Sequence, residues 1–377
     1  MLYVGTMIGL FGNIMLNIYM AYALTSLGLK TLLSYFLLNT FLINYVFMPC
    51  GFLALRKIPH SIFFPCVILL GIIITLSSLF WTAQLGIIHF SLIFSCSAAP
   101  FWLLFHSCML AFTSRDNVGN ETSMAHLSIT LGAVFGSIAA GIFLSLGTDR
   151  ETMIYTGAGL LALACLFIFV FCEKRGLLSE TPEKETLRFK LSLFTEPQRA
   201  FATMADAFHA VSTEILWPVW IKLIGAGGLA AGLLYAFTVT MKLLLSPLTG
   251  YLTNRQTTLE MKYGALFKLA GWLPWIISLH PLTSLFSSVL FAAGSHLFKV
   301  GIESRWYLAK SYTHMACREV IHGTGRIITY LALVPILFYA PQFFIALGII
   351  LSALAYLAAY SLTQSRLTPV PVSVGKV

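Results

Sequence analysis

The chain has 377 residues, of which 58% are hydrophobic and only 10% are charged. Soluble domains carry about 25% charged residues, so a fold of this size could not cover its surface in water with so few charges. The formal net charge is +9, but the basic residues lie between apolar runs and form no basic stripe with interleaved aromatic residues. We therefore expect an integral membrane protein with no nucleic-acid partner.

Long continuous apolar runs predict transmembrane α-helices, whereas a β-barrel would show short alternating segments. The segments 67–79, 160–171 and 343–357 contain no charge at all. A bilayer core of about 30 Å needs about 20 apolar residues per helix, so an all-α membrane protein with about twelve transmembrane helices is expected. The predicted spans are 3–27, 32–54, 61–81, 86–112, 124–147, 152–172, 200–223, 229–252, 263–280, 284–306, 321–339 and 342–363.

The basic residues outside these spans are distributed unevenly between the two sides of the membrane. Only Lys30 and Arg150 lie after odd-numbered spans. The loops after even-numbered spans, with Arg305 counted at the edge of span ten, and the C-terminal tail hold the other 16: Arg56, Lys57, Arg115, Lys174, Arg175, Lys184, Arg188, Lys190, Arg199, Arg255, Lys262, Arg305, Lys310, Arg318, Arg366 and Lys376. Loops rich in Lys and Arg face the cytoplasm, so both termini are predicted to be cytoplasmic.

The longest polar stretch, residues 173–199, falls between spans six and seven and divides the chain in two. It contains SETPEKETLRFK and is predicted to be a cytoplasmic linker. Residues 1–172 and 200–363 then form two six-helix halves, and residues 364–377 form a cytoplasmic tail.

Two landmarks repeat between these halves. Span two ends in Gly51–Arg56 and span eight ends in Gly250–Arg255, an offset of 199 residues. Glu121, at the start of span five, and Glu319, at the start of span eleven, repeat with an offset of 198 residues. Six-helix halves with an internal repeat are typical of secondary transporters, so the halves are predicted to be pseudo-symmetric.

With twelve spans, a basic central loop and these motifs, the chain resembles the major facilitator superfamily. That family carries Gly-x-Leu-x-Asp-Arg after span two, often echoed after span eight. The corresponding gate motif here has Leu55 and Asn254 at the acidic positions, and its retained residues are Gly51, Leu53, Arg56, Gly250, Leu252 and Arg255. The resemblance implies that a solute binds near the midplane between the halves, which rock to expose it alternately.

Ionisable side chains within the predicted spans are the candidate functional residues, because a charge in hydrocarbon is costly. Two stripes arise, each on one side of its helix, on span seven and span ten: Asp206, His209, Glu214, His296, Lys299 and Glu303. The resemblance implies that spans one, four, seven and ten line the central cavity. Span one adds Asn13 and Asn17, and span four adds His106.

Coupling to protons is the expected energy source. We expect Asp206 and Glu303 to face one cavity, with at least one of them as the proton site and Lys299 as its partner, because desolvated carboxylates can titrate near neutral pH. In the structural alternative, the same carboxylates pair with Lys299 only to hold two helices together.

Several other polar residues have packing interpretations. His89, Lys242, Lys268 and Arg326 are more typical of core or interface residues. Asn39 and Asn44 of span two are expected to form hydrogen bonds between helices. Six of the seven cysteines lie in or beside apolar runs and none belongs to a CxxC pair, so they are interpreted as small apolar residues.

Span five contains Gly132, Gly136 and Gly141, whose spacing lets neighbouring helices approach closely. The same segment resembles the superfamily's exporter motif, with Ser137 and Ala140 replacing two of its residues. Helix packing is the first interpretation of this pattern, and solute export is the second.

No cofactor, metal ion or catalytic residue is expected, because the sequence lacks a phosphate-binding Gly loop, a GxSxG elbow and an HExxH motif. Asp206, His209, His296 and Glu303 have the chemistry of metal ligands and the i, i+3 pair on span seven has a usable spacing, but nothing else in the sequence singles out a metal site. The predicted protein is a secondary active transporter for a small solute, a monomer surrounded by lipid in a bacterial-type inner membrane. The alternatives are a non-transporting receptor or scaffold with a transporter fold and a membrane-embedded transferase.

The predicted orientation can be tested with topology reporters. A reporter fused after Arg188 should read cytoplasmic and one fused after Asp149 should read extracytoplasmic, because basic loops are retained inside. The reverse pattern would contradict the orientation, and the same side for both would contradict the number of spans.

Overall fold

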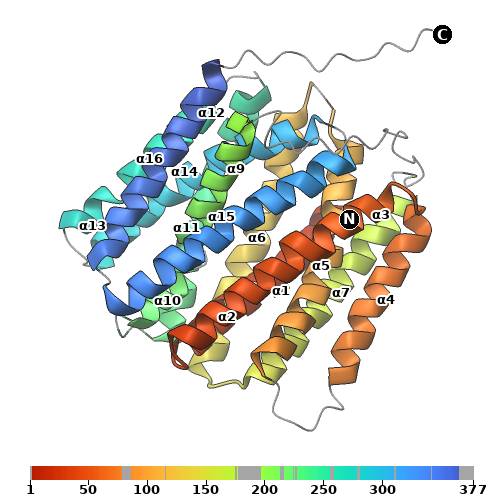
Figure 1. Cartoon of the computed structure of the whole chain (residues 1–377), viewed down its shortest axis with the longest axis horizontal. Coiled ribbons are helices and arrows are strands. Elements are labelled where there is room, and N and C mark those ends of the chain that lie inside the picture. The colour runs from red at the N-terminus through yellow and green to blue at the C-terminus, as the bar shows by residue number, and fades with distance from the viewer. Residues whose placement is uncertain are drawn as a thin grey trace.

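The structure is a computed structural model and describes residues 2–78, 86–114, 116–174, 176, 197–212, 216–223, 225, 227–254, 259–277, 281–309, 311–340 and 342–364. Within these ranges the chain is helical apart from short turns and contains no strand. Figure 1 shows the red-to-yellow helices on one side of the bundle and the green-to-blue helices on the other. We call α1–α7 the N-terminal half and α9–α16 the C-terminal half.

The helices follow one another with short connections. The N-terminal half consists of α1 (Leu2–Thr25), α2 (Leu29–Thr40), η1 (Phe41–Phe47), α3 (Met48–Leu55), α4 (His60–Ser78), α5 (Ile87–Phe112), α6 (Val118–Ser145) and α7 (Arg150–Lys174). The C-terminal half consists of α9 (Pro197–Ala210), α10 (Trp217–Leu223), α11 (Gly228–Asn254), α12 (Leu259–Ala270), α13 (Leu273–Ile277), α14 (Pro281–Tyr307), α15 (Tyr312–Tyr339) and α16 (Gln342–Gln364).

The predicted fold class, an all-α membrane protein with about twelve spans, is confirmed. Ten helical segments in the described part of the chain are long and apolar enough to cross a membrane. The other two predicted spans, seven and nine, are each divided into a pair of shorter helices, α9 with α10 and α12 with α13. Pro274 explains the second break, because its ring would clash with the carbonyl of Ala270, the last residue of α12.

The start of the eleventh span differs from its prediction. Helix α15 begins at Tyr312, nine residues before the predicted residue 321. Arg305 and Arg318, which the sequence assigned to loops, lie within α14 and α15 and are only 9% and 7% exposed. Both are therefore corrected to interior residues. The predicted linker lies mostly outside the described residues, as does the tail beyond residue 364.

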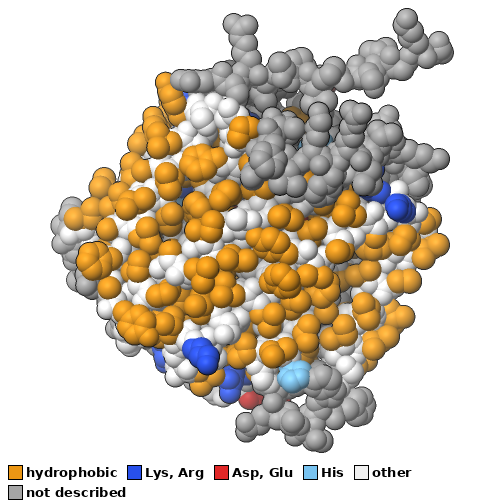
Figure 2. Space-filling view, in the orientation of Figure 1, with side chains coloured by type: hydrophobic (Ala, Val, Ile, Leu, Met, Phe, Trp, Pro, Cys, Tyr) orange, Lys and Arg blue, Asp and Glu red, His pale blue; other side chains and the backbone are white. Residues whose placement is uncertain are grey.

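The outer surface is apolar, as a lipid-facing surface requires. Figure 2 shows hydrophobic side chains across the broad face of the bundle, with charged side chains at its edges. On α4, for example, the side chains of Ile62, Leu69 and Ile73 are all more than half exposed. Contiguous apolar surface of this extent marks a site of contact with a membrane or a partner.

The second span changes its helical geometry in the middle. Residues Phe41–Phe47 form a π-helix, in which the backbone N–H of Met48 donates to the carbonyl of Ile43 five residues earlier. Pro49 has no N–H to donate to the carbonyl of Tyr45, which favours a wider turn at this point. Such π turns occur frequently at functional sites, and this one carries Asn44.

Small residues of α6 bring two helices into backbone contact. A Cβ atom added at Gly132 would clash with the carbonyl oxygen of Met7, and one added at Gly136 would lie 2.5 Å from that of Phe11, both on α1. Farther along α6, Gly141 lies against the backbone of Gly232 on α11. The span-five pattern therefore packs helices together, within the N-terminal half and across to the other half.

Two cysteines correct the apolar interpretation. Cys108 of α5 and Cys172 of α7 form a disulfide within the N-terminal half. The other five cysteines are free, and of these Cys96, Cys165 and Cys317 are buried as small side chains. The sequence did not indicate this pair through a CxxC spacing, because the two cysteines are 64 residues apart and meet only when α5 packs on α7.

The close packing of α6 on α1 predicts a stability difference between two glycine variants. Gly132→Val should lower the apparent stability of the purified protein by about 1–3 kcal/mol, because its side chain meets a backbone carbonyl that cannot rotate away. Gly159→Val is the matched control, since nothing lies within 4 Å of a Cβ at that position on α7. Equal thermal unfolding temperatures for the two variants would contradict the packing.

Candidate functional site

A polar cavity of about 200 Å³ lies between the two halves. Helices α1, α2, α5 and α6 and the π turn η1 contribute its wall from the N-terminal half, and α9, α11, α14 and α15 from the other half. Its polar lining residues are Asn13, Asn17, Asn39, Thr40, Asn44, Trp102, His106, His126, Thr130, Tyr235, Lys242, Ser295, His296, Lys299, Glu303, Arg318, Glu319, His322, Arg326 and Tyr330.

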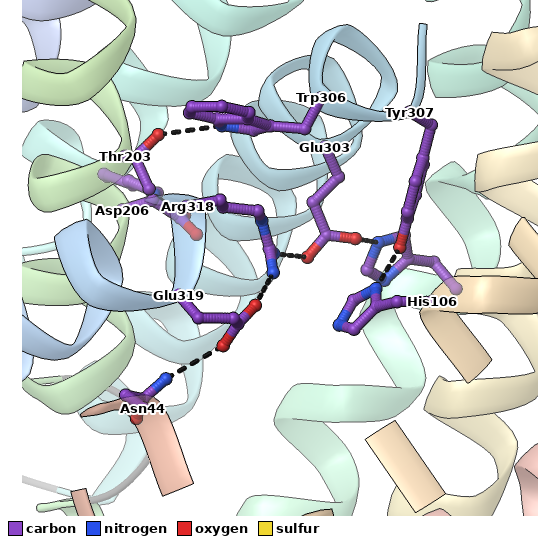
Figure 3. Close-up of polar contacts among 11 residues, drawn as sticks. Asn44, His106, Thr203, Asp206, Glu303, Trp306, Tyr307, Arg318 and Glu319 are labelled. Carbon is purple, nitrogen blue, oxygen red and sulfur yellow. Dashed lines mark hydrogen bonds and ion pairs between the residues drawn. The ribbon is translucent and has the colours of Figure 1, made fainter. Parts of the chain in front are cut away.

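A buried chain of charged and polar groups crosses one side of this cavity (Figure 3). Glu303 of α14 accepts hydrogen bonds from His126 Nε2 at 2.8 Å and from Arg318 Nη2 at 2.8 Å. The other terminal nitrogen of Arg318 donates to Glu319, whose second oxygen accepts from Asn44 Nδ2 at 2.9 Å. All five side chains are buried, so the guanidinium of Arg318 is the cation that balances both carboxylates.

The local fold explains how this chain of contacts forms. The π turn η1 carries Asn44 toward α15, where Gly323 leaves room, since a Cβ at Gly323 would lie 2.6 Å from the Cβ of Asn44. One residue along, the hydroxyl of Tyr45 lies 2.7 Å from that of Thr324. The π turn and a glycine of the facing helix therefore bring the second and eleventh spans into polar contact.

Further links join the halves where α3, α5, α11 and α14 end and α4, α6, α12 and α15 begin, and we call this end of the bundle the linked end. His106 Nδ1 lies 2.7 Å from the hydroxyl of Tyr307, and Trp102 stacks on the His106 ring. His60 Nε2 lies 2.7 Å from the hydroxyl of Tyr312. These bonds tie α4 and α5 to α14 and α15.

The gate motif of the second half caps a helix of the first. The side-chain oxygen of Asn254 accepts from the backbone N–H of Gly119 at 2.7 Å and of Asn120 at 3.2 Å. These N–H groups belong to the first turn of α6, which has no side-chain cap of its own. In the first half Leu55 is buried instead, and the N-terminus of α15 is capped by its own Ser311.

The structure brings most of the predicted cavity residues together. Asn13 and Asn17 line the cavity and form a hydrogen bond of 3.3 Å with each other. His106, His296, Lys299 and Glu303 also line it. The Nε2 atom of His296 lies 3.0 Å from the hydroxyl of Ser246 on α11, and the two groups form a hydrogen bond.

Two span-seven residues lie elsewhere, which corrects the expectation that Asp206 faces the cavity beside Glu303. Asp206 pairs with Lys268 Nζ of α12 at 3.4 Å and is not among the lining residues. His209 is 1% exposed and its ring lies against Phe291. Lys268 thus has the core role that the sequence suggested.

The remaining predicted residues concern spans seven, two and eight. Glu214 and Arg255 lie outside the described residues. Gly51 lies close to the side chain of Leu103, and Gly250 lies close to Asn120 of the other half. Arg56 is half-buried at the end of α3. A side chain at either glycine would therefore clash with a neighbouring helix, and the role of the two glycines in gating remains a proposal.

Sequence reasoning missed several residues of the site. His126 was not singled out, and Lys242 and Arg326 were interpreted as packing residues although both line the cavity. Glu319 was recognised only as the counterpart of Glu121, but their surroundings differ, since Glu121 accepts from the backbone N–H of Ser114, seven residues earlier in the loop before α6. No local pattern marks His126, whose partner Glu303 is 177 residues away.

Metal binding finds no support among the described side chains, where no group of three or more His, Cys, Asp and Glu residues could hold a metal ion. Asp206, His209, His296 and Glu303, considered as possible ligands, are each engaged with another protein group or ring.

The fold itself is shared with known transporters. The sequence matches no protein-family model and no curated protein sequence. A crystal structure of a bacterial homologue of the iron transporter ferroportin in an outward-facing state has a TM-score of 0.71 and 12% identity, with 96% of this chain and 98% of that chain covered. The human organic anion transporter MFSD10 (TETRAN) has a TM-score of 0.66 and 12% identity, with 95% and 98% covered.

These similarities cover nearly the whole chain and define its architecture. The chain has the major-facilitator fold, with twelve spans in two six-helix halves, as the sequence predicted. At 12% identity these similarities establish the fold of the chain but do not identify the solute.

The charge balance around Arg318 predicts an unusually large effect on stability. Arg318→Met should lower the stability of the purified protein by about 3–5 kcal/mol, because Glu303 and Glu319 would remain buried without their shared cation. The triple variant that adds Glu303→Gln and Glu319→Gln should recover most of the loss. Arg150→Met, at an exposed arginine, is the control, expected to stay within about 0.5 kcal/mol. No rescue in the triple variant would contradict the assigned balance.

Proposed function

We propose that this chain is a secondary active transporter that moves a small solute across a membrane by alternating access. The observation that carries the proposal is a polar cavity whose walls come from both halves. His296 of its lining is eleven residues from the end of α14, about 16 Å along a helix about 40 Å long, so the cavity lies near the middle of the bundle. Midplane sites at the junction of two repeats are typical of secondary transporters.

The contacts around the cavity support two alternating closures. At the linked end the halves are joined by hydrogen bonds such as His60–Tyr312 and Asn254–Gly119. On the other side of the Asn44–Glu319 bond, Phe36 of α2 stacks on Tyr330 of α15 with ring centroids 4.8 Å apart. Rocking of the halves would break one set of contacts while keeping the other, and would thus open the cavity to one side at a time.

The membrane setting and orientation belong to the same proposal. We place the chain in a bacterial-type inner membrane as a monomer, with both termini and the linked end facing the cytoplasm, on the basis of the loop charges. In this orientation the described conformation is closed toward the cytoplasm. Export remains a hypothesis based on the span-five pattern alone, since its glycines already have a packing role.

Proton coupling is assigned to Glu303. Its carboxylate faces His126 from α6 and Arg318 from α15, with Lys299 one turn away on its own helix, and Glu319 shares Arg318. Protonation of Glu303 would remove the charge that attracts His126 and Arg318. Because His126 belongs to the other half, this weakens a link across the cavity and couples the proton to the movement of the halves.

Exchange of solutes in proteoliposomes tests the transport proposal directly. Liposomes containing the protein and loaded with an unlabelled small-molecule cell extract are placed in the same extract labelled with ¹³C, and their contents are analysed by mass spectrometry. A transporter accumulates at least one labelled compound above the level of protein-free liposomes. No accumulation would favour a receptor or scaffold, and a new covalent product would favour a transferase.

Glu303→Gln should abolish accumulation driven by a pH gradient while solute exchange continues, because the variant cannot release or bind the coupling proton. The matched control is Asp206→Asn combined with Lys268→Met, which removes a buried ion pair outside the cavity lining and should retain pH-driven accumulation. Full pH-driven accumulation by Glu303→Gln would place the proton site elsewhere.

A further inference from the structure

The cavity contains more cationic than acidic side chains. Four cations line it, from three helices of the C-terminal half: Lys242, Lys299, Arg318 and Arg326. Only Glu303 and Glu319 oppose them among the lining residues. Both carboxylates are already occupied, because Arg318 bonds to each of them and His126 and Asn44 take their remaining oxygens.

The two other buried acids described in the C-terminal half are also engaged. Asp206 pairs with Lys268 at 3.4 Å, and Glu260 pairs with Arg305 at 3.2 Å. Within the described part of the chain, neither Lys299 nor Arg326 therefore has a carboxylate within ion-pairing distance. Neither side chain is neutralised by an ion pair of its own with a described acid, so this wall carries more positive than negative charge.

Arg326 shows this surplus most clearly. Its Nε is buried and has no hydrogen-bond partner among the described residues, although it lines the cavity. A buried donor of a charged group without a partner is costly, and a guanidinium presents donors in a fork that matches a carboxylate or phosphate. Lys299 lies on α14, one helical turn from His296, and is half-buried at the same cavity.

The opposite wall has a different chemistry. From the N-terminal half, the cavity is lined by Asn13, Asn17 and Asn39 and by the rings of Trp102 and His106, and by no Lys, Arg, Asp or Glu. These groups offer neutral hydrogen bonds and aromatic contact. A ligand that spans the cavity would thus place an anionic group against α14 and α15 and a neutral polar part against α1, α2 and α5.

We propose that the solute of this cavity is a small organic oxyanion, with Lys299 and Arg326 as the residues that bind its charged group. The proposal rests on the transport function proposed above, because the bound anion is a solute only if the chain transports it. The volume of about 200 Å³ restricts the ligand to a small molecule. The shared chemistry is a carboxylate or a phosphate, and the test separates the two.

The experiment uses the purified full-length chain in detergent at constant ionic strength, with thermal unfolding as the readout. Succinate is compared with its neutral diamide, succinamide, and with the dication 1,4-diaminobutane, and glycerol 3-phosphate is compared with glycerol. We expect succinate or glycerol 3-phosphate to raise Tm while the neutral and cationic compounds leave it unchanged, because a ligand that binds only the folded state stabilises it. Which of the two anions acts distinguishes carboxylate from phosphate.

Variants then assign the effect to the two residues. Lys299→Met and Arg326→Met should each increase the anion concentration needed for half of the rise in Tm by about tenfold or more. The reason is that a hydrogen bond to a charged group contributes about 1.5–3 kcal/mol. Lys299→Arg and Arg326→Lys keep the charge and should retain the response even where truncation impairs folding. Lys174→Met removes the same charge at the exposed end of α7 and should bind anions normally.

The possible outcomes separate this inference from the transport function. Stabilisation by the dication or equally by the diamide, no response to any compound, or an unchanged response in the double Met variant would each overturn the anion proposal. Anion binding without exchange of the same labelled anion in proteoliposomes would instead overturn transport and leave the binding site in place. Exchange of the diamide or the diamine alone would leave transport in place and overturn the anion proposal.

Discussion

The ion pairs made by Arg318 are the interaction on which the site depends. One buried guanidinium balances two buried carboxylates, and all three groups belong to the C-terminal half. The N-terminal half contributes only His126 and Asn44, which complete the hydrogen bonds of the carboxylates. Separation of the halves would therefore break the contacts made by His126 and Asn44, whereas both ion pairs of Arg318 would stay within one half. Each such hydrogen bond contributes about 1.5–3 kcal/mol, which is small enough to be broken and formed again when a transporter changes conformation.

The fold was largely predictable because the bilayer constrains the sequence so strongly. Uncharged runs such as 160–171 locate spans without any knowledge of their neighbours, since a helix satisfies its own backbone in lipid. Locating spans from uncharged runs fails where a charged residue of the span is neutralised by residues of other helices. Arg318 and Glu319 made residues 312–320 look like a loop, yet their partners on α14 and η1 allow α15 to begin at Tyr312.

The site was only partly predictable, for a related reason. Helical periodicity places residues on a face of one helix but does not say which neighbour that face meets. Lys299 and Glu303 were placed correctly because their helix, α14, is continuous through the level of the cavity. Asp206 was not placed correctly. Its helix, α9, ends at Ala210, and the Asp206 carboxylate pairs with Lys268 of α12, a helix that the sequence did not connect with span seven. The pairing of His126 with Glu303 depends on how the two halves dock, which no local pattern records.

The asymmetry between the two walls connects the proposed proton site with the proposed solute. The cations of the cavity lie on α11, α14 and α15, where Glu303 is one of only two lining acids. Protonation of Glu303 would remove a negative charge beside Lys299 and make this wall more cationic. An anion would then bind more tightly, and by linkage a bound anion would favour protonation to the same extent. Mutually favourable binding of the two ligands supports movement of both in one direction. An inward proton gradient would therefore drive uptake of the anion, which opposes the export that the span-five glycines suggested and agrees with their purely structural role against α1 and α11.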